Sequence, residues 1–96
     1  MSVRLIITMR AAPGKGADLA AAMRGRCLEV QQEPGCEQFE VFQSALEPDR
    51  LVLMERWADQ AALEMHSEVN RTPPLSESLR SGDAGEREDY EYNRTR

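Results

Sequence analysis

The most apolar part of the chain is a single unit that runs from Leu51 to His66. Its first half, Leu51–Trp57, follows the turn-like residues 47–50 and is almost continuously apolar at its start, which predicts a strand buried on both faces. Asp59 is a good helix N-cap and precedes an alanine-rich turn. We therefore expect a helix from about Asp59 to Val69.

The N-terminal third predicts a strand followed by an amphipathic helix. Val3–Arg10 has few polar positions and predicts the first strand, which the proline- and glycine-containing residues 13–16 end. A helix is expected to start at residues 15–18 and to run to about Gln32, where Glu33-Pro34-Gly35 stops it. Its apolar stripe consists of Leu19, Met23, Cys27 and Val30.

Two more strands are indicated on either side of the Leu51–His66 unit. Cys36–Ala45 places a large apolar residue on each of its faces, and the turn at residues 47–50 predicts a hairpin with the strand that follows. Glu86–Tyr92 is charged, and only its two tyrosines favour a strand. Pro73 and Pro74 end the second helix. The remaining expectations are a short helical turn at 75–79, a polar loop at 81–85 and a frayed tail at 93–96.

The predicted order of elements is β-α-β-β-α-β, which is a ferredoxin-like α+β arrangement with both helices on one face of the sheet. A chain of 96 residues makes a single domain, residues 1–96. The second face of the sheet would leave apolar side chains in water if the chain were alone. We therefore expect a homodimer.

Charge and composition exclude several classes of partner. The net charge is −5 and no basic stripe is present, so we expect no nucleic-acid partner. The apolar runs are too short to span a bilayer and no signal-peptide pattern starts the chain, so we expect no membrane partner and a cytoplasmic location. Cys27 and Cys36 lack the spacing of metal ligands and the chain has one histidine, so we expect free thiols and no metal site.

Several short segments carry a resemblance through their order and spacing. They are residues 13–15, 33–36, 39–42, 49–50, 55–59 and 62–63, and His66. Together they resemble the antibiotic biosynthesis monooxygenase domain family from about residue 3 to residue 66, and the likeness fades from Asn70 onward. The resemblance implies a dimeric α+β barrel in which two sheets pack face to face, with a pocket between each sheet and its own helices.

The resemblance implies more than one chemistry. Some members of the family oxidise quinols, anthrones or related phenolic polycycles with O₂ and without metal or flavin. Others degrade haem, and one group isomerises a signalling sugar phosphate. The fold alone does not choose between these reactions.

Two departures from the family pattern narrow this range. Haem-degrading members use an asparagine, a tryptophan and a histidine at positions where this chain has Ile7, His66 and Ser76. Anthrone-oxidising members use an asparagine where this chain has Leu53, although the tryptophan four residues later is kept as Trp57. Haem chemistry is therefore not expected, and the asparagine's role does not carry over.

His66 is the leading candidate for a catalytic residue. It is the only side chain whose ordinary pKa lies near neutrality, and its spacing from Leu63 predicts that it faces the sheet. One interpretation is a base that takes a phenolic proton, or a partner that holds the resulting anion. The alternative is a core histidine that a backbone carbonyl or Glu55 satisfies.

Glu55 and Trp57 share a face of their strand with Leu53. A carboxylate in an apolar strand must be paired, hydrogen-bonded or protonated, so Glu55 is a candidate to orient His66, although an ion pair with an arginine is an equal alternative. Trp57 is a candidate stacking wall for a planar substrate, or a core residue that holds the second helix on the sheet. Leu53, Ile7 and Leu63 complete the expected substrate-binding set.

These residues lead us to expect a monooxygenase without cofactor that acts on a quinol-like or polycyclic phenolic compound and O₂. Two alternatives stay open. In an isomerase of a small sugar-derived metabolite, the same histidine and glutamate would shuttle protons. A protein of this fold that binds a small molecule would show no turnover.

Overall fold

The structure is a computed structural model of the chain, and it describes residues 1–69 and 87–92. The described elements are β1 (Ser2–Arg10), α1 (Gly16–Val30), β2 (Cys36–Gln43), β3 (Arg50–Trp57), α2 (Gln60–Val69) and β4 (Arg87–Tyr92). Their order confirms the predicted β-α-β-β-α-β sequence of a ferredoxin-like α+β fold. The expectations for residues 75–79, 81–85 and 93–96 lie outside the described residues.

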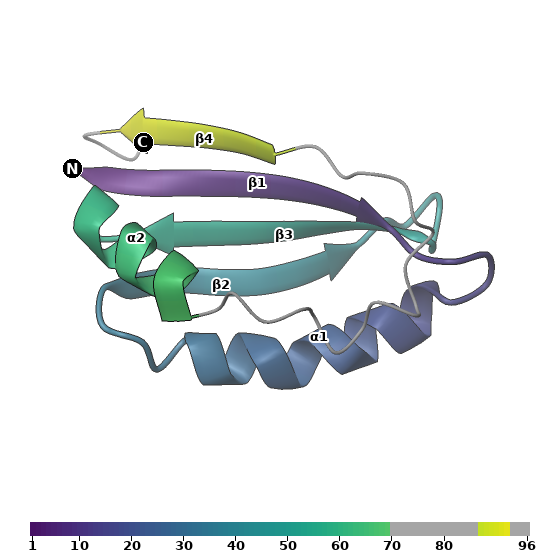
Figure 1. Cartoon of the computed structure of the whole chain (residues 1–96). Helices are drawn as coiled ribbons and strands as arrows, with labels where there is room; N and C mark the ends of the chain where they lie inside the picture. Colours follow the sequence, from purple (N-terminus) through teal and green to yellow (C-terminus); the bar gives the residue numbers. More distant parts are fainter. Residues whose placement is uncertain (70–86, 93–96) are drawn as a thin grey trace.

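The strands form one antiparallel sheet in the order β2-β3-β1-β4, so β1 and β3 are its central strands. Both helices lie on the same side of this sheet (Figure 1). The register places Leu53 opposite Ile7 and Trp57 opposite Val3. Directly opposed residues share a face, so these four residues lie on one face of the sheet. They belong to the core or pack against it, which identifies this face as the one beneath the helices.

The core lies between this face and the helices. Leu19, Met23, Cys27 and Val30 are all buried, which confirms the stripe predicted for α1. Along β3, burial alternates residue by residue, and every second residue from Leu51 to Trp57 is buried. In this single chain, β3 is therefore fully covered on one face and only partly covered on the other.

Local hydrogen bonds explain where the element boundaries differ from the prediction. The strand expected to reach Ala45 ends at Gln43, because the hydroxyl of Ser44 accepts hydrogen bonds from the amides of residues 46 and 47 and turns the chain. The helix expected to reach Gln32 ends at Val30, after which the amides of residues 32 and 33 donate to carbonyls three residues back. Asp59 Oδ1 accepts from the amide of Ala62 at 2.9 Å, so Asp59 caps α2 as predicted.

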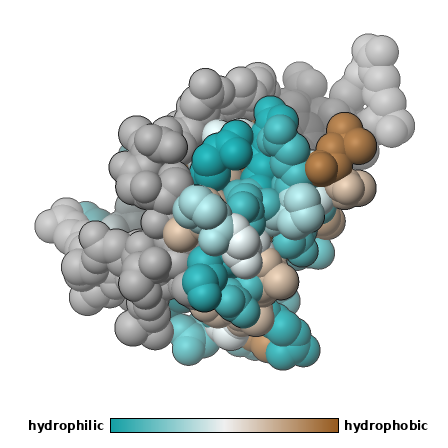
Figure 2. Space-filling model, turned by 90° about the vertical axis from the view of Figure 1, so that its right-hand side faces the viewer, coloured by the Kyte–Doolittle hydropathy of each residue, from teal (hydrophilic) through white to brown (hydrophobic). Residues whose placement is uncertain are grey.

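The β1–α1 connection is tied to the β2–β3 hairpin at one end of the sheet. Both oxygens of Asp49 accept hydrogen bonds of 2.9 Å, one from the amide of Gly14 and the other from that of Gly16. The surface at this end is mostly hydrophilic (Figure 2).

The face of the sheet away from the helices is apolar in its middle. Ile6, Val52 and Met54 are partly exposed there, and Phe42 is 47% exposed. Arg56 lies on this same face, with its Nε 3.4 Å from Glu37 Oε1. Among the described residues, no helix is long and apolar enough to cross a membrane.

Candidate functional site

His66 lies on α2 and faces the sheet, as its spacing predicted. Its imidazole lies 4.6 Å from the ring of Trp57, with the two planes inclined by 32°, and 5.5 Å from the ring of Phe39 in an edge-on contact. The side chain is 12% exposed. The ring is therefore held between aromatic groups but is not sealed from solvent.

The carboxylate next to His66 belongs to Glu33. The Nδ1 atom of His66 lies 2.9 Å from Glu33 Oε1, and the Glu33 side chain is 23% exposed. An ionised carboxylate can only accept a hydrogen bond, so this geometry assigns the proton of a neutral imidazole to Nδ1. It leaves Nε2 as the ring atom with the basic lone pair, which is the arrangement of a carboxylate-oriented general base.

A tight turn brings Glu33 to α2. The amide of Cys36 donates to the carbonyl of Glu33, and Gly35 between them has φ +81°. The carbonyl of Gly35 then accepts from the amide of Ala58 at 2.8 Å, and a Cβ on Gly35 would lie 2.5 Å from that of Ala62. The α1–β2 connection and the start of α2 therefore pack directly against each other, at one end of the sheet (Figure 1).

Glu55 and Trp57 form a second, buried polar contact. The indole nitrogen Nε1 of Trp57 donates to Glu55 Oε1 at 3.0 Å. Trp57 is fully buried and Glu55 is 4% exposed. Glu55 thus touches the ring on which His66 lies, whereas the carboxylate at His66 Nδ1 is that of Glu33. The ring contact between Trp57 and His66 joins β3 to α2.

The other three residues expected to bind substrate lie in the core. Leu53 and Leu63 are buried, and Ile7 is partly buried against the same cluster. They lie on the helix-covered face of the sheet together with Trp57. The structure therefore places the whole predicted set on one side of the sheet, with His66 and Trp57 in direct ring contact.

The two cysteines are free, and neither is prepared to act as a nucleophile. Burial, followed by the charges of Glu33 and Glu55, raises the pKa of the Cys36 thiol to about 11. Burial also raises the pKa of Cys27. Both thiols are therefore protonated near neutral pH, whereas the nucleophilic form is the thiolate.

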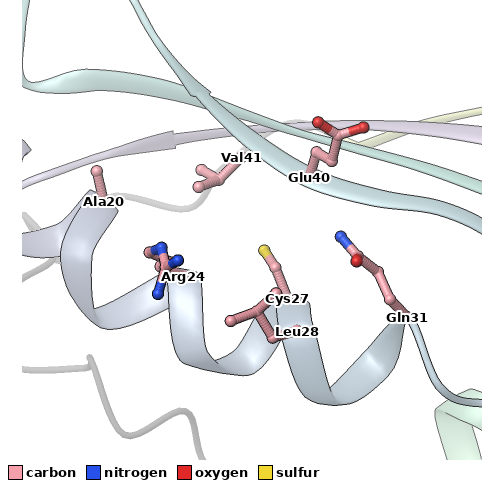
Figure 3. A pocket seen from close by; sticks show the side chains of 7 residues that line it. All are labelled: Ala20, Arg24, Cys27, Leu28, Gln31, Glu40 and Val41. Carbon is pink, nitrogen blue, oxygen red and sulfur yellow. The ribbon is translucent and has the colours of Figure 1, made fainter.

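A surface groove of about 310 Å³ runs between α1 and β2, and none of its lining residues belongs to the set predicted from sequence. In Figure 3, the helix supplies most of its wall and the edge strand β2 supplies the rest. Gln31 donates to the carbonyl of Phe39 at 3.0 Å, which satisfies part of the edge strand's backbone. The lining residues are Ala20, Arg24, Cys27, Leu28, Gln31, Glu40 and Val41.

Within residues 1–69 and 87–92, no group of three or more His, Cys, Asp or Glu side chains could hold a metal ion.

Glu33 is the site residue that sequence reasoning missed. The sequence assigns it to the turn that stops the first helix and to a segment that carries the family resemblance, but not to the site. It is separated from His66 by 33 residues. One feature of the sequence indicates that Glu33 lies near α2. Residues 33–35 follow the first helix and the N-cap Asp59 precedes the second, so these two connections lie at the same end of the sheet, where β3 ends at Trp57. Pattern along the chain does not show which side chains meet across that end.

Comparisons with known proteins agree with the fold. The family profile described as antibiotic biosynthesis monooxygenase matches residues 2–70. The solved structure of PA3566 from Pseudomonas aeruginosa is similar, with 26% identity and a TM-score of 0.80 over 97% of this chain and 95% of that one. The comparison with curated proteins finds no match.

Two further solved structures share the fold. A conserved protein from Methanosarcina mazei Go1 has 24% identity and a TM-score of 0.81, over 97% of this chain and 94% of that chain. The crystal structure of an antibiotic biosynthesis monooxygenase has 23% identity and a TM-score of 0.79, over 96% of this chain and 99% of that chain. At these identities the likeness concerns the fold.

Proposed function

The chain belongs to the antibiotic biosynthesis monooxygenase family, and we propose that it oxygenates a small phenolic or quinol-like compound with O₂, using His66 as the base. The observation that carries this proposal is the 2.9 Å hydrogen bond between His66 Nδ1 and Glu33 Oε1. A carboxylate at this nitrogen orients the ring and stabilises the imidazolium that forms when Nε2 takes a proton.

The proposed reaction starts with the transfer of an acidic substrate proton to Nε2. For an anthrone-like CH₂ group, this leaves an electron-rich carbanion that is also a phenolate. The anion bonds to O₂, and the resulting peroxide anion takes the proton back from the imidazolium. Loss of water from the hydroperoxide then gives the ketone, so that CH₂ and O₂ become C=O and H₂O. In this sequence His66 first acts as base and then as acid.

We also propose that a second copy of the chain covers the open face of the sheet. Ile6, Val52, Met54 and Phe42 leave that face apolar and partly exposed, and both helices lie on the other side. A sheet-to-sheet homodimer would bury these side chains. Sedimentation equilibrium at micromolar concentration tests this pairing, and a mass of 10.8 kDa, that of one chain, would contradict it.

The activity is tested by oxygen uptake with the purified, metal-stripped protein against a panel of quinols and anthrones. We expect uptake above autoxidation for at least one compound, one O₂ consumed per product, and one oxygen atom from labelled O₂ in that product. Protein denatured by heat serves as the blank for each compound.

Two other results would replace the proposal. Conversion of a sugar-derived metabolite that continues under argon would identify an isomerase, because no oxygen would be consumed. Saturable binding of a panel compound without conversion would identify a binding protein. Uptake at the autoxidation rate across the whole panel would contradict the oxygenase proposal itself.

A further inference from the structure

We propose that Glu55 is a positioning residue: by accepting the indole N–H of Trp57, it fixes the plane against which the imidazole of His66 lies. This inference deepens the proposed function and rests on it for its catalytic consequence. It differs from the expectation that Glu55 orients His66 by direct contact, because here Glu55 acts through Trp57.

Glu55 lies in a buried, otherwise apolar row of the sheet. Its direct neighbours on the adjacent strands are Leu5 on β1 and Phe39 on β2, which are both buried, and Glu55 itself is 4% exposed. An acidic side chain in such a row carries a large desolvation cost unless polar groups satisfy it. An apolar residue of similar volume would suit this row for packing alone, so packing does not explain why a carboxyl group is present.

The Glu55 carboxylate fixes the orientation of the Trp57 indole. Nε1 of Trp57 lies 3.0 Å from Glu55 Oε1, and the indole is fully buried. An indole has one donor and no acceptor, so a buried indole is oriented by whichever group accepts that N–H. Glu55 therefore selects one rotation of the Trp57 ring among those that the core would accommodate.

The Trp57 indole in turn contacts the imidazole of His66. The imidazole of His66 lies 4.6 Å from the indole with the planes inclined by 32°, while Glu33 holds Nδ1 at 2.9 Å. Glu33 limits rotation of the imidazole about its own bond, and the Trp57 ring limits its tilt. Two carboxylates on different elements thus act on one imidazole: Glu33 directly, and Glu55 through the indole.

The chain contains one tryptophan and one histidine, so NMR can observe each of the two rings separately. The indole N–H of Trp57 and the carbon-bound ring protons of His66 each give a single set of NMR resonances, so no assignment by mutation is required. Protons held over an indole face are shifted upfield by its ring current. We expect this shift for His66 in the native protein, together with slow solvent exchange of the Trp57 indole N–H.

The decisive comparison is between Glu55→Met and Glu55→Gln. Methionine keeps the length of the side chain but removes the oxygen acceptor, whereas glutamine keeps an oxygen at the same place without the charge. We expect Glu55→Met to reduce the upfield shift of His66 and to lower kcat by about 10- to 100-fold, the range expected when a base is misplaced. Glu55→Gln should keep the upfield shift of His66 and kcat within about twofold of the native values, because its amide oxygen can still accept the indole N–H of Trp57.

A double-mutant cycle asks whether the effect passes through Trp57. In Trp57→Phe the donor is absent, so adding Glu55→Met should lower kcat no further than the more affected single variant. Additive losses would contradict the proposal. If Trp57→Phe does not fold, the comparison of Glu55→Met with Glu55→Gln still tests the positioning role of Glu55.

The failure of this inference is distinguishable from the failure of the proposed function. The NMR comparison needs no substrate, so an absence of oxygen uptake leaves it intact. An unchanged His66 shift in Glu55→Met, or a glutamine variant as impaired as the methionine variant, would overturn the positioning role while leaving oxygen uptake by the native protein untouched.

Discussion

Replacing His66 by alanine is expected to lower the rate of oxygen uptake by about 10²- to 10⁴-fold, the usual contribution of a positioned acid–base group. The reason is that Nε2 both accepts the substrate proton and returns it to the peroxide, so both steps lose their catalyst. His66→Gln should show the same loss while filling more of the space against Trp57. The measurement is kcat in the oxygen-uptake assay, with the fold of each variant checked by circular dichroism.

The matched control is Ser67→Ala, which makes an alanine at the exposed next position of α2. It should retain the native rate, because it changes helix composition but not the imidazole. Uptake that survives in both His66 variants would keep an oxygenase activity but remove His66 from the reaction. A loss of rate in Ser67→Ala as large as in His66→Ala would show that the assay reports damage to α2 instead.

The largest effect on stability at the site is expected for Gly35→Ala. Gly35 has φ +81°, which costs an alanine about 1–2 kcal/mol. Its new Cβ would also lie 2.5 Å from that of Ala62, and such overpacking typically adds about 1–3 kcal/mol. We therefore expect a loss of about 2–5 kcal/mol in the free energy of unfolding, measured by urea denaturation.

Gly14→Ala separates the two contributions to that loss. Gly14 has nearly the same backbone conformation, φ +77°, but a Cβ there would meet nothing within 4 Å. Its cost should be the backbone cost alone, about 1–2 kcal/mol. Equal losses at the two glycines would show that the contact between the α1–β2 connection and α2 is not as close as described. That result would also weaken the placement of Glu33 beside His66.

Much of the fold follows from short-range pattern in the sequence. The alternation of Leu53, Glu55 and Trp57 predicted their shared face because side chains alternate strictly along a strand. The steps of three and four residues in α1 predicted its buried stripe for a similar reason. Element ends were predicted less well, since Ser44 ends β2 through hydrogen bonds of its own side chain, which hydrophobic pattern does not encode.

The candidate site was predicted only in part. The inward direction of His66 could be predicted, because its distance from Leu63 is one helical turn, and its contact with Trp57 agrees with that prediction. The partner of Nδ1 could not, because Glu33 reaches it across the end of the sheet through a turn that depends on the conformation of Gly35. Contacts of this kind depend on how two connections pack together in space, and spacing along one element does not show it.

The central claim is that Glu33 holds His66 with Nε2 as the basic atom. Its most direct test is ¹⁵N NMR of the single histidine at alkaline pH. The two nitrogens of a neutral imidazole have well-separated resonances, so the spectrum shows directly which one carries the proton. We expect the Nδ1–H form to dominate in the native protein and to decrease in Glu33→Met, which removes the oxygen acceptor. Glu29→Met, on the preceding helix α1, should leave the spectrum unchanged. A native spectrum dominated by the Nε2–H form would contradict the claim, because Nε2 would then have no lone pair with which to take a proton.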